Sequence, residues 1–296
     1  MPSSASTSRR ATRRQPASSS WASTRCERYV VKLGGSLGTE MANACDDLRT
    51  LVAQGAEVVV VHGGGAAADQ VTVELGRRKR YLTARDGRRS RYTDAAALDA
   101  LTLGILGRVK PAIVTALGDR AVGLSGVDGG MVKATRNRPA RATVDGREMI
   151  VRDDLSGRVS EVDTTLPRAL LAAGFVPVVS PPALGPDGPL NVDADRFAAA
   201  LAIALAADWL IVLSNVPGLL RDLDDPTSVV PEVPADLDVS VADGRMRVKL
   251  QAAAAARRAG VTNVVLADGR ADSPITAARA GAGTRFTEGK PDVRAS

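Results

Sequence analysis

Short runs of β-branched residues alternate with alanine-rich segments along most of this 296-residue chain. Runs such as Val58–Val61 and Leu210–Leu213 are short and apolar, which favours buried strands of a parallel sheet. The alanine-rich stretches Asp195–Ala206 and Lys249–Ala259 favour helices instead. Because strands and helices alternate, we predict an α/β fold with a mostly parallel central sheet and helices on both faces.

The same pattern places the individual elements. Strands are expected at Tyr29–Leu33, Glu57–Val61, Ala121–Leu124, Val176–Val179, Trp209–Leu213 and Asn263–Leu266. Helices are expected after the first two of these strands, one ending near Gln54 and one covering Ala66–Leu75. Residues 77–93 and 132–162 resemble β-turns more than helices, so we expect hairpins that project from the sheet.

The amino-terminal residues 1–27 differ from the rest of the chain. They are rich in Ser, Thr, Ala and Arg, contain Glu27 as their one acid and lack hydrophobic periodicity. This composition predicts a disordered tail. An organellar targeting peptide and an upstream start codon are alternative explanations.

Composition excludes several kinds of site. Two cysteines, Cys26 and Cys45, and one histidine, His62, are too few for a disulfide framework or a Cys/His zinc cluster, and they fit a reducing cytoplasm. The net charge of +6 would attract nucleic acid, but aromatic residues for base stacking make up only 3% of the chain. Since no run of about 18 apolar residues occurs, no membrane span is predicted either.

Glycines directly follow two of the predicted strands, in the segments Lys32–Ser36 and His62–Gly65. Glycines allow the backbone to approach an anion, which the amides and the dipole of the following helix attract. One such junction is more often a tight turn, but two on adjacent strands indicate a ligand site at the carboxyl edge of the sheet. Neither is a Walker A loop or a dinucleotide-binding fingerprint. Lys32 is placed to reach the anion, and His62 is interpreted as structural.

Two polar segments precede the alanine-rich helices. In Asn191-Val192-Asp193-Ala194-Asp195, a helix N-cap accounts for one of the three polar residues, which leaves Asp195 as a candidate for orienting lysines that handle phosphate. In the segment Asp243–Lys249, the lysine taken alone would be interpreted as a solvated helix residue.

Together these elements resemble the amino-acid-kinase family over nearly all of residues 28–288, and the N-acetylglutamate kinase branch in particular. Within that branch the chain is most similar to kinases of 2-aminoadipate tethered to an amino-group carrier protein. The segments that carry this similarity are Ser90–Asp94, Val176–Leu184, Leu213–Asp222 and Ala267–Arg270.

The resemblance implies a two-lobed α/β/α sandwich. Residues 28–190 would form an acceptor-substrate lobe and residues 191–290 a nucleotide-binding lobe, followed by a carboxyl-terminal tail at 291–296. Homodimers through the acceptor lobe are usual in the family. The implied cofactors are ATP and Mg²⁺, with the metal bound mainly by the nucleotide's oxygens and by no set of protein ligands.

The resemblance also implies roles for the residues at matching positions. Lys32 and Lys249 would stabilise charge on the transferring phosphoryl group, and Asp195 would hold both lysines in place. Arg91 would pair with a substrate carboxylate through its planar fork of donors. Asn191 would hydrogen-bond the amide region of the substrate.

Glycines and loop residues would complete the two binding sites. Gly64 and Gly65 would hold the acceptor, and Gly35 would donate backbone hydrogen bonds to phosphate. The residues expected to flank the nucleotide are Asn215, Val216, Pro217, Gly218, Leu219, Leu220, Val241, Ala242 and Asp243.

The implied reaction is ATP-dependent phosphorylation of the side-chain carboxylate of an amino-protected amino acid, which gives an acyl phosphate. N-acetylglutamate kinase is the alternative, although Tyr92 after Arg91, and Val127 where free-substrate enzymes commonly have lysine, weigh against it. An inactive kinase-fold sensor is a second alternative, although the charged residues Lys32, Lys249 and Asp195 are all present. Arg245, where the family usually has glycine, has no explanation.

A basic segment favours an acidic carrier protein as the partner. In residues 77–91, Asp86 alone opposes the basic residues Arg77, Arg78, Lys79, Arg80, Arg85, Arg88, Arg89 and Arg91. A solvated hairpin whose charge aids solubility is the alternative interpretation. Because the segment ends at Arg91, we expect the surplus charge beside the mouth of the acceptor site, where it would attract an acidic protein.

Overall fold

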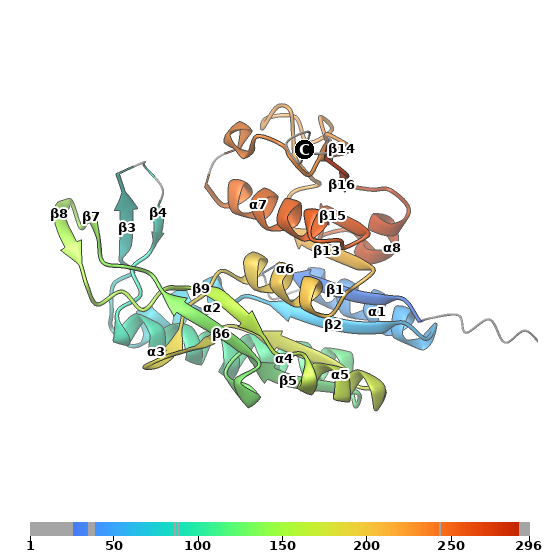
Figure 1. Cartoon of the computed structure of the whole chain (residues 1–296), viewed down its shortest axis with the longest axis horizontal. Coiled ribbons are helices and arrows are strands. Elements are labelled where there is room, and N and C mark those ends of the chain that lie inside the picture. The colour runs from blue at the N-terminus through green and yellow to red at the C-terminus, as the bar shows by residue number, and fades with distance from the viewer. Residues whose placement is uncertain (1–25, 35–38, 86, 88, 243, 290–296) are drawn as a thin grey trace, which may run out of the picture.

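Six parallel strands form the centre of the molecule, and every strand predicted from the sequence is among them. The computed structural model describes residues 26–34, 39–85, 87, 89–242 and 244–289. Residues 1–25 and 290–296, which include most of the predicted tails, lie outside the described residues, as do Gly35, Arg88 and Asp243. The α/β class predicted from the alternation is confirmed (Figure 1).

Two further strands extend this sheet to eight. In order across the sheet, the strands are β14 (Glu232–Pro234), β16 (Thr284–Thr287), β15 (Asn263–Asp268), β13 (Trp209–Ser214), β1 (Arg28–Leu33), β2 (Glu57–His62), β10 (Val176–Ser180) and β5 (Ala121–Ser125). Only β16 pairs antiparallel with its neighbour β15, while β14 runs parallel to β16. The ends of β1, β2, β10, β13 and β15 therefore meet at one carboxyl edge, as the parallel arrangement requires.

Helices cover both faces of the sheet. One face packs against α5 (Thr165–Ala172), α6 (Ala194–Ala204) and α7 (Gly244–Arg258). The other face packs against α1 (Thr39–Ala53), α4 (Lys110–Leu117) and α8 (Pro274–Arg279), with α2 (Gly65–Glu74) and α3 (Ala95–Gly104) beyond them. Since strand side chains alternate, Val30 belongs to the first core and Val31 to the second.

A π-helical segment, Ile105–Val109, joins α3 to α4 into one helix over Ala95–Leu117. Among the described residues this is the one helix long and apolar enough to cross a membrane, although Asp99, Arg108 and Lys110 interrupt its apolar sequence. Such a helix is weak evidence for a span, because core helices of soluble proteins meet the same criterion. Here α3 packs against α2, and α4 packs against α1 and β5.

Two four-stranded sheets extend from the central one. The first contains β12 (Gly188–Leu190), β11 (Ala183–Gly185), β6 (Val132–Arg136) and β9 (Gly157–Val162), and the second contains β4 (Arg89–Arg91), β3 (Tyr81–Ala84), β7 (Ala140–Val144) and β8 (Arg147–Val151). The predicted hairpin at 77–93 is confirmed, whereas residues 132–162 are divided between the two sheets. In Figure 1 the second sheet, which we call the hairpin sheet, stands out at one end of the molecule.

A buried carboxylate joins α1 to α8. Asp47 on α1 is 8% exposed. It accepts hydrogen bonds from the backbone amides of Ile275 and Thr276, at 2.7 and 2.8 Å, and from the Thr276 hydroxyl at 2.6 Å. These amides belong to the first turn of α8, where no helical carbonyl is available to them.

We expect Asp47→Ala to lower the free energy of unfolding by about 2 kcal/mol, because the buried donors of α8 lose their acceptor. Urea denaturation of the variant and the wild type measures this difference. Asp46→Ala is the matched control on the same helix, since Asp46 pairs with Arg49 at the surface and its loss should cost less than about 0.5 kcal/mol. Equal losses in the two variants would contradict the assigned role of Asp47.

Candidate active site

One carboxylate lies between two ammonium groups at the carboxyl edge of the sheet. The Lys32 Nζ atom lies 2.8 Å from Asp195 Oδ1, and the Lys249 Nζ atom lies 3.0 Å from Asp195 Oδ2 and 3.2 Å from Oδ1. The three residues come from β1, α6 and α7. Their side chains are between 8% and 13% exposed, so the contact is largely withdrawn from water.

We call Lys32, Asp195 and Lys249 the charged triad. Burial and the neighbouring charges shift the pKa values of Asp195 and Lys249 within it. Burial raises the pKa of Asp195, but the positive charges and hydrogen bonds of Lys32 and Lys249 outweigh it and hold that pKa below the ordinary range. Burial and the charge of Lys32 lower the pKa of Lys249, against the attraction of Asp195. With all three residues ionised, the triad carries one surplus positive charge in a poorly hydrated site, where an anion such as a phosphoryl group is strongly attracted.

The start of α6 explains how Asp195 is presented. Asp193 is the N-cap, and its carboxylate accepts hydrogen bonds from the backbone amides of Asp195 and Arg196, each at 3.0 Å. Burial and the neighbouring charge of Asp195 raise the pKa of Asp193. The capping function that the sequence indicated is therefore performed by Asp193, which leaves the side chain of Asp195 free for the lysines.

The glycine turn after β2 is held by close packing. A Cβ atom on Gly64 would lie 2.6 Å from Ile105 Cγ1, so the start of α2 approaches the π segment more closely than a side chain would permit. On the other side, a Cβ on Gly63 would lie 3.5 Å from the Cβ of Ala194 in α6. The turn thus lies next to the helix that carries Asp195. Gly65 meets no such restriction.

The residues expected to bind the acceptor gather beside this turn. Arg91 at the end of β4 donates from Nη2 to the Gly65 carbonyl oxygen at 3.3 Å. Asn191 donates from Nδ2 to Thr93 Oγ1 at 3.0 Å. Thr93 therefore connects Asn191 to the strand end that carries Arg91. Whether these residues bind an acceptor stays a prediction.

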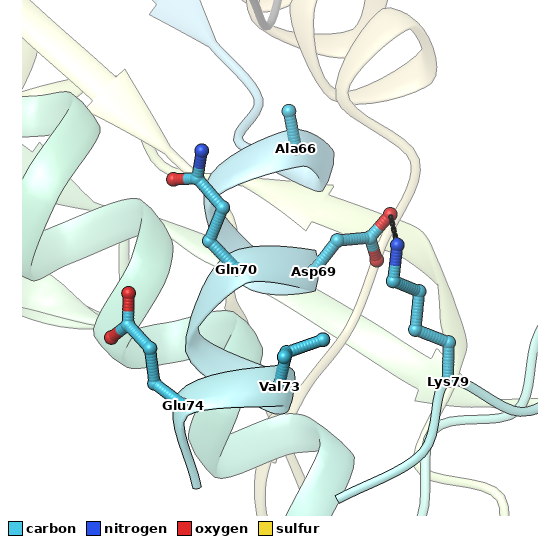
Figure 2. Close-up of a pocket in the computed structure, with 6 residues that line it drawn as sticks. All are labelled: Ala66, Asp69, Gln70, Val73, Glu74 and Lys79. Carbon is cyan, nitrogen blue, oxygen red and sulfur yellow. Dashed lines mark ion pairs between the residues drawn. The ribbon is translucent and has the colours of Figure 1, made fainter. Parts of the chain in front are cut away.

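Two carboxylates in this region were not singled out from the sequence. Asp69 on α2 accepts from Arg91 Nη2 at 2.5 Å and also pairs with Lys79, as Figure 2 shows. Asp154 accepts from the backbone amide of Thr93 at 2.9 Å, and burial raises its pKa. The position of Asp69, one turn after Gly65, was a signal available in the sequence, whereas the contact of Asp154 depends on the tertiary fold.

The residues expected to flank the nucleotide follow strands at the same edge. Asn215 comes directly after β13, where it is exposed, and the segment continues through Val216 and Pro217. A Cβ on Gly218 would lie 2.7 Å from Thr284 Oγ1, so this glycine permits close packing against β16. The last two residues of this segment are Leu219, which is buried, and Leu220, which is half-buried.

The second group expected at the nucleotide precedes α7. Val241 ends a short 3₁₀ turn, and Ala242 is buried and accepts a hydrogen bond from Arg247 Nε at 2.8 Å.

Within the described ranges, no three His, Cys, Asp or Glu side chains group closely enough to hold a metal ion. Binding of Mg²⁺ through the nucleotide's oxygens stays a prediction.

Comparison with known proteins decides the family. Residues 27–268 match the amino acid kinase family. The chain belongs to this family. Two amino acid kinases similar to it are the "[LysW]-aminoadipate kinase" proteins of Deinococcus radiodurans and Thermus thermophilus, at 41% and 38% identity. The alignments cover 86% of this chain in both cases, and 90% and 98% of the two relatives.

Other matches extend the comparison. An acetylglutamate kinase of Symbiobacterium thermophilum is 36% identical, with 81% of this chain and 84% of the relative covered. Among solved structures, the N-acetylglutamate synthase of Neisseria gonorrhoeae has a TM-score of 0.69 at 25% identity. That match covers 88% of this chain and 61% of the synthase, so the chain spans about three fifths of that protein. The predicted family and fold are confirmed.

The single histidine of this kinase lies at the glycine turn. His62 is fully buried, and its Nδ1 atom donates to the Gly63 carbonyl oxygen at 2.8 Å. Burial and, to a smaller extent, the charge of Lys110 lower its pKa to about 4, against the opposing effect of that hydrogen bond. Its Nε2 atom has no hydrogen-bond partner among the described residues. The ring is therefore neutral at pH 7, with the proton on Nδ1.

We expect a histidine NMR titration of the folded protein to have its midpoint near pH 4, with the Nδ1-protonated tautomer above it. Because the folded-state pKa lies below the ordinary value of 6.5, unfolding takes up a proton between the two values. Stability should therefore fall as the pH drops from about 6.5 to 4, by about 3 kcal/mol from this group. A midpoint near 6.5 would contradict the buried, neutral ring.

Proposed function

We propose that this protein catalyses ATP-dependent phosphorylation of the side-chain carboxylate of an amino-protected amino acid, with an acyl phosphate as the product. The observation that carries the proposal is the placement of Lys32 and Lys249 on the two oxygens of Asp195. Two ammonium groups from different elements, held about one carboxylate, provide the positive charge that phosphoryl transfer requires. Membership of the amino acid kinase family supports the same reaction class.

In the proposed reaction, a carboxylate oxygen of the acceptor attacks the γ-phosphorus of ATP. A new P–O bond forms, the bond from the γ-phosphorus to the bridging oxygen breaks, and ADP leaves with that electron pair. No proton has to be transferred, so the protein contributes position and charge. Lys32 and Lys249 stabilise the phosphoryl oxygens, and Asp195 positions the two lysines. Mg²⁺, when bound with the nucleotide, supplies further charge neutralisation.

The acceptor in our proposal is 2-aminoadipate linked to an acidic amino-group carrier protein. The names of the relatives from Deinococcus radiodurans and Thermus thermophilus support this choice. N-acetylglutamate is the second candidate, because acetylglutamate kinases also match the chain. Cytoplasmic location and dimerisation through the acceptor lobe belong to the same proposal.

We expect Lys32→Ala and Lys249→Ala each to lower kcat by about 10² or more, since each removes a preorganised positive charge. ATP consumption with carrier-linked aminoadipate and with N-acetylglutamate measures the effect and also shows which acceptor is used. Lys133→Ala is the matched control, because Lys133 pairs with Glu161 at the surface. Near-normal turnover in either active-site variant, with Lys133→Ala also normal, would remove that lysine from the mechanism.

The hairpin sheet offers a surface for an acidic carrier. Its strand register places Arg89, Arg91 and Arg141 on one face, whereas Arg147 shares the opposite face with Val144. The Arg89 guanidinium lies over the Tyr81 ring, 4.0 Å from its centre, which fixes its position. The face with Arg91 therefore combines the predicted carboxylate ligand with exposed positive charge. A complementary field of this kind would speed encounter with an acidic protein.

For carrier-linked substrate we expect Arg89→Ser with Arg141→Ser to lower kcat/KM several-fold at low salt and to leave kcat nearly unchanged. The kcat/KM of the wild type should fall as the salt concentration rises, and the kcat/KM of the double variant should fall less. The matched control is Arg120→Ser with Arg147→Ser, which removes the same charge from positions away from this face. Equal salt dependence in the wild type and the Arg89/Arg141 variant would show that this face does not steer the carrier.

A further inference from the structure

The guanidinium of Arg91 is already engaged by the protein itself. Its Nη2 atom donates to Asp69 Oδ1 at 2.5 Å and to the Gly65 carbonyl oxygen at 3.3 Å. The Arg91 side chain is 15% exposed and that of Asp69 is 25% exposed, so this ion pair is partly shielded from water. The Asp69 carboxylate therefore already binds the Arg91 guanidinium, which the proposed function assigns to the acceptor carboxylate.

The geometry of a guanidinium means that the contact of Arg91 Nη2 with Asp69 limits how a second carboxylate can bind. A carboxylate can bind with two parallel hydrogen bonds either to Nε and Nη2 or to Nη1 and Nη2. Both arrangements use Nη2, which carries only two hydrogens. In Arg91 those hydrogens serve Asp69 and Gly65. A second carboxylate can bind bidentately only if it displaces one of these acceptors.

Asp69 has another positive partner. Its Oδ2 atom lies 3.5 Å from the Nζ atom of Lys79, in the segment between α2 and β3. Figure 2 shows Lys79 reaching toward Asp69 along the side of an open pocket on α2, which Ala66, Gln70, Val73 and Glu74 also line. If Arg91 turned away from Asp69, that carboxylate would keep a cationic neighbour. Release of Arg91 therefore does not leave Asp69 without a counter-ion.

We propose that Asp69 is an internal competitor for Arg91, which the acceptor carboxylate displaces on binding while Lys79 retains Asp69. The inference rests on the proposed function, because it concerns the same acceptor site. Asp69 is in this view a positioning residue that holds the Arg91 guanidinium at the mouth of the site. Its competition sets how tightly an acceptor carboxylate must bind in order to displace it from Arg91. A ligand without a carboxylate would not release Arg91.

The proposal predicts opposite effects on the acceptor's KM for substitutions of Asp69 and of its neighbour Lys79. Asp69→Asn removes the competing charge and should lower the acceptor's KM by roughly three- to tenfold, with the KM for ATP unchanged. Lys79→Met strengthens the competition and should raise the acceptor's KM. In the Asp69→Asn background, Lys79→Met should have little further effect, since it acts through Asp69. Glu74→Gln is the control for a general change of charge, because Glu74 lies on the same helix as Asp69 but pairs with Arg108 of the π segment.

Steady-state kinetics of the full chain test this, with carrier-linked aminoadipate or N-acetylglutamate, whichever the wild type phosphorylates. If the KM of Asp69→Asn for that acceptor is unchanged or raised, the inference is wrong and the proposed function survives. If Glu74→Gln lowered the KM for the acceptor as much as Asp69→Asn does, the inference would also be overturned, because the effect would then come from the change of net charge alone. No turnover of either acceptor by the wild type would overturn the proposed function and this inference together.

Discussion

The contact of Asp195 with Lys32 and Lys249 is the interaction on which the candidate site depends. Two ammonium groups close together in a poorly hydrated place repel each other. The Asp195 carboxylate between them offsets this repulsion and sets their separation. Because the three residues come from β1, α6 and α7, the contact also ties the two helices to the central strand at its carboxyl end.

This contact requires that α6 begin at one particular place. Asp193 caps the helix, and its position directs the next carboxylate, Asp195, toward the lysines. The glycine turn after β2 lies close by, held between α6 and the π segment. Gly104 has a comparable role, since a Cβ there would lie 2.6 Å from the backbone nitrogen of Ala68 in α2. Close helix packing, which glycines permit because they have no side chain, thus brings α2 and Asp69 to the proposed acceptor site.

The proposed acceptor site is assembled from distant segments by hydrogen bonds. Thr93 accepts from Asn191 and donates its backbone amide to Asp154, so loops before α3, β9 and α6 meet at one residue. Arg91, two residues earlier, lies on the hairpin sheet and contacts α2. Displacing any one of these segments would move the predicted ligand of the acceptor carboxylate. If Arg91 binds the acceptor as we propose, recognition of the acceptor depends on the fold of the hairpin sheet.

The sequence alone determined the fold class and the central strands, because burial of β-branched runs and the helical period of alanine-rich stretches are local properties. It also indicated Lys32 and Asp195 through their positions beside a glycine turn and a helix start, whereas Lys249 was indicated only by the resemblance to the amino-acid-kinase family. The tertiary structure decided which carboxylates face which cations. Asp69, which the sequence did not single out, meets Arg91, and Asp193 is the residue that caps α6, since hydrogen-bond pairing depends on how helices pack. The contact of Lys32 with Asp195 joins residues 163 positions apart (32 to 195), and no local pattern records it.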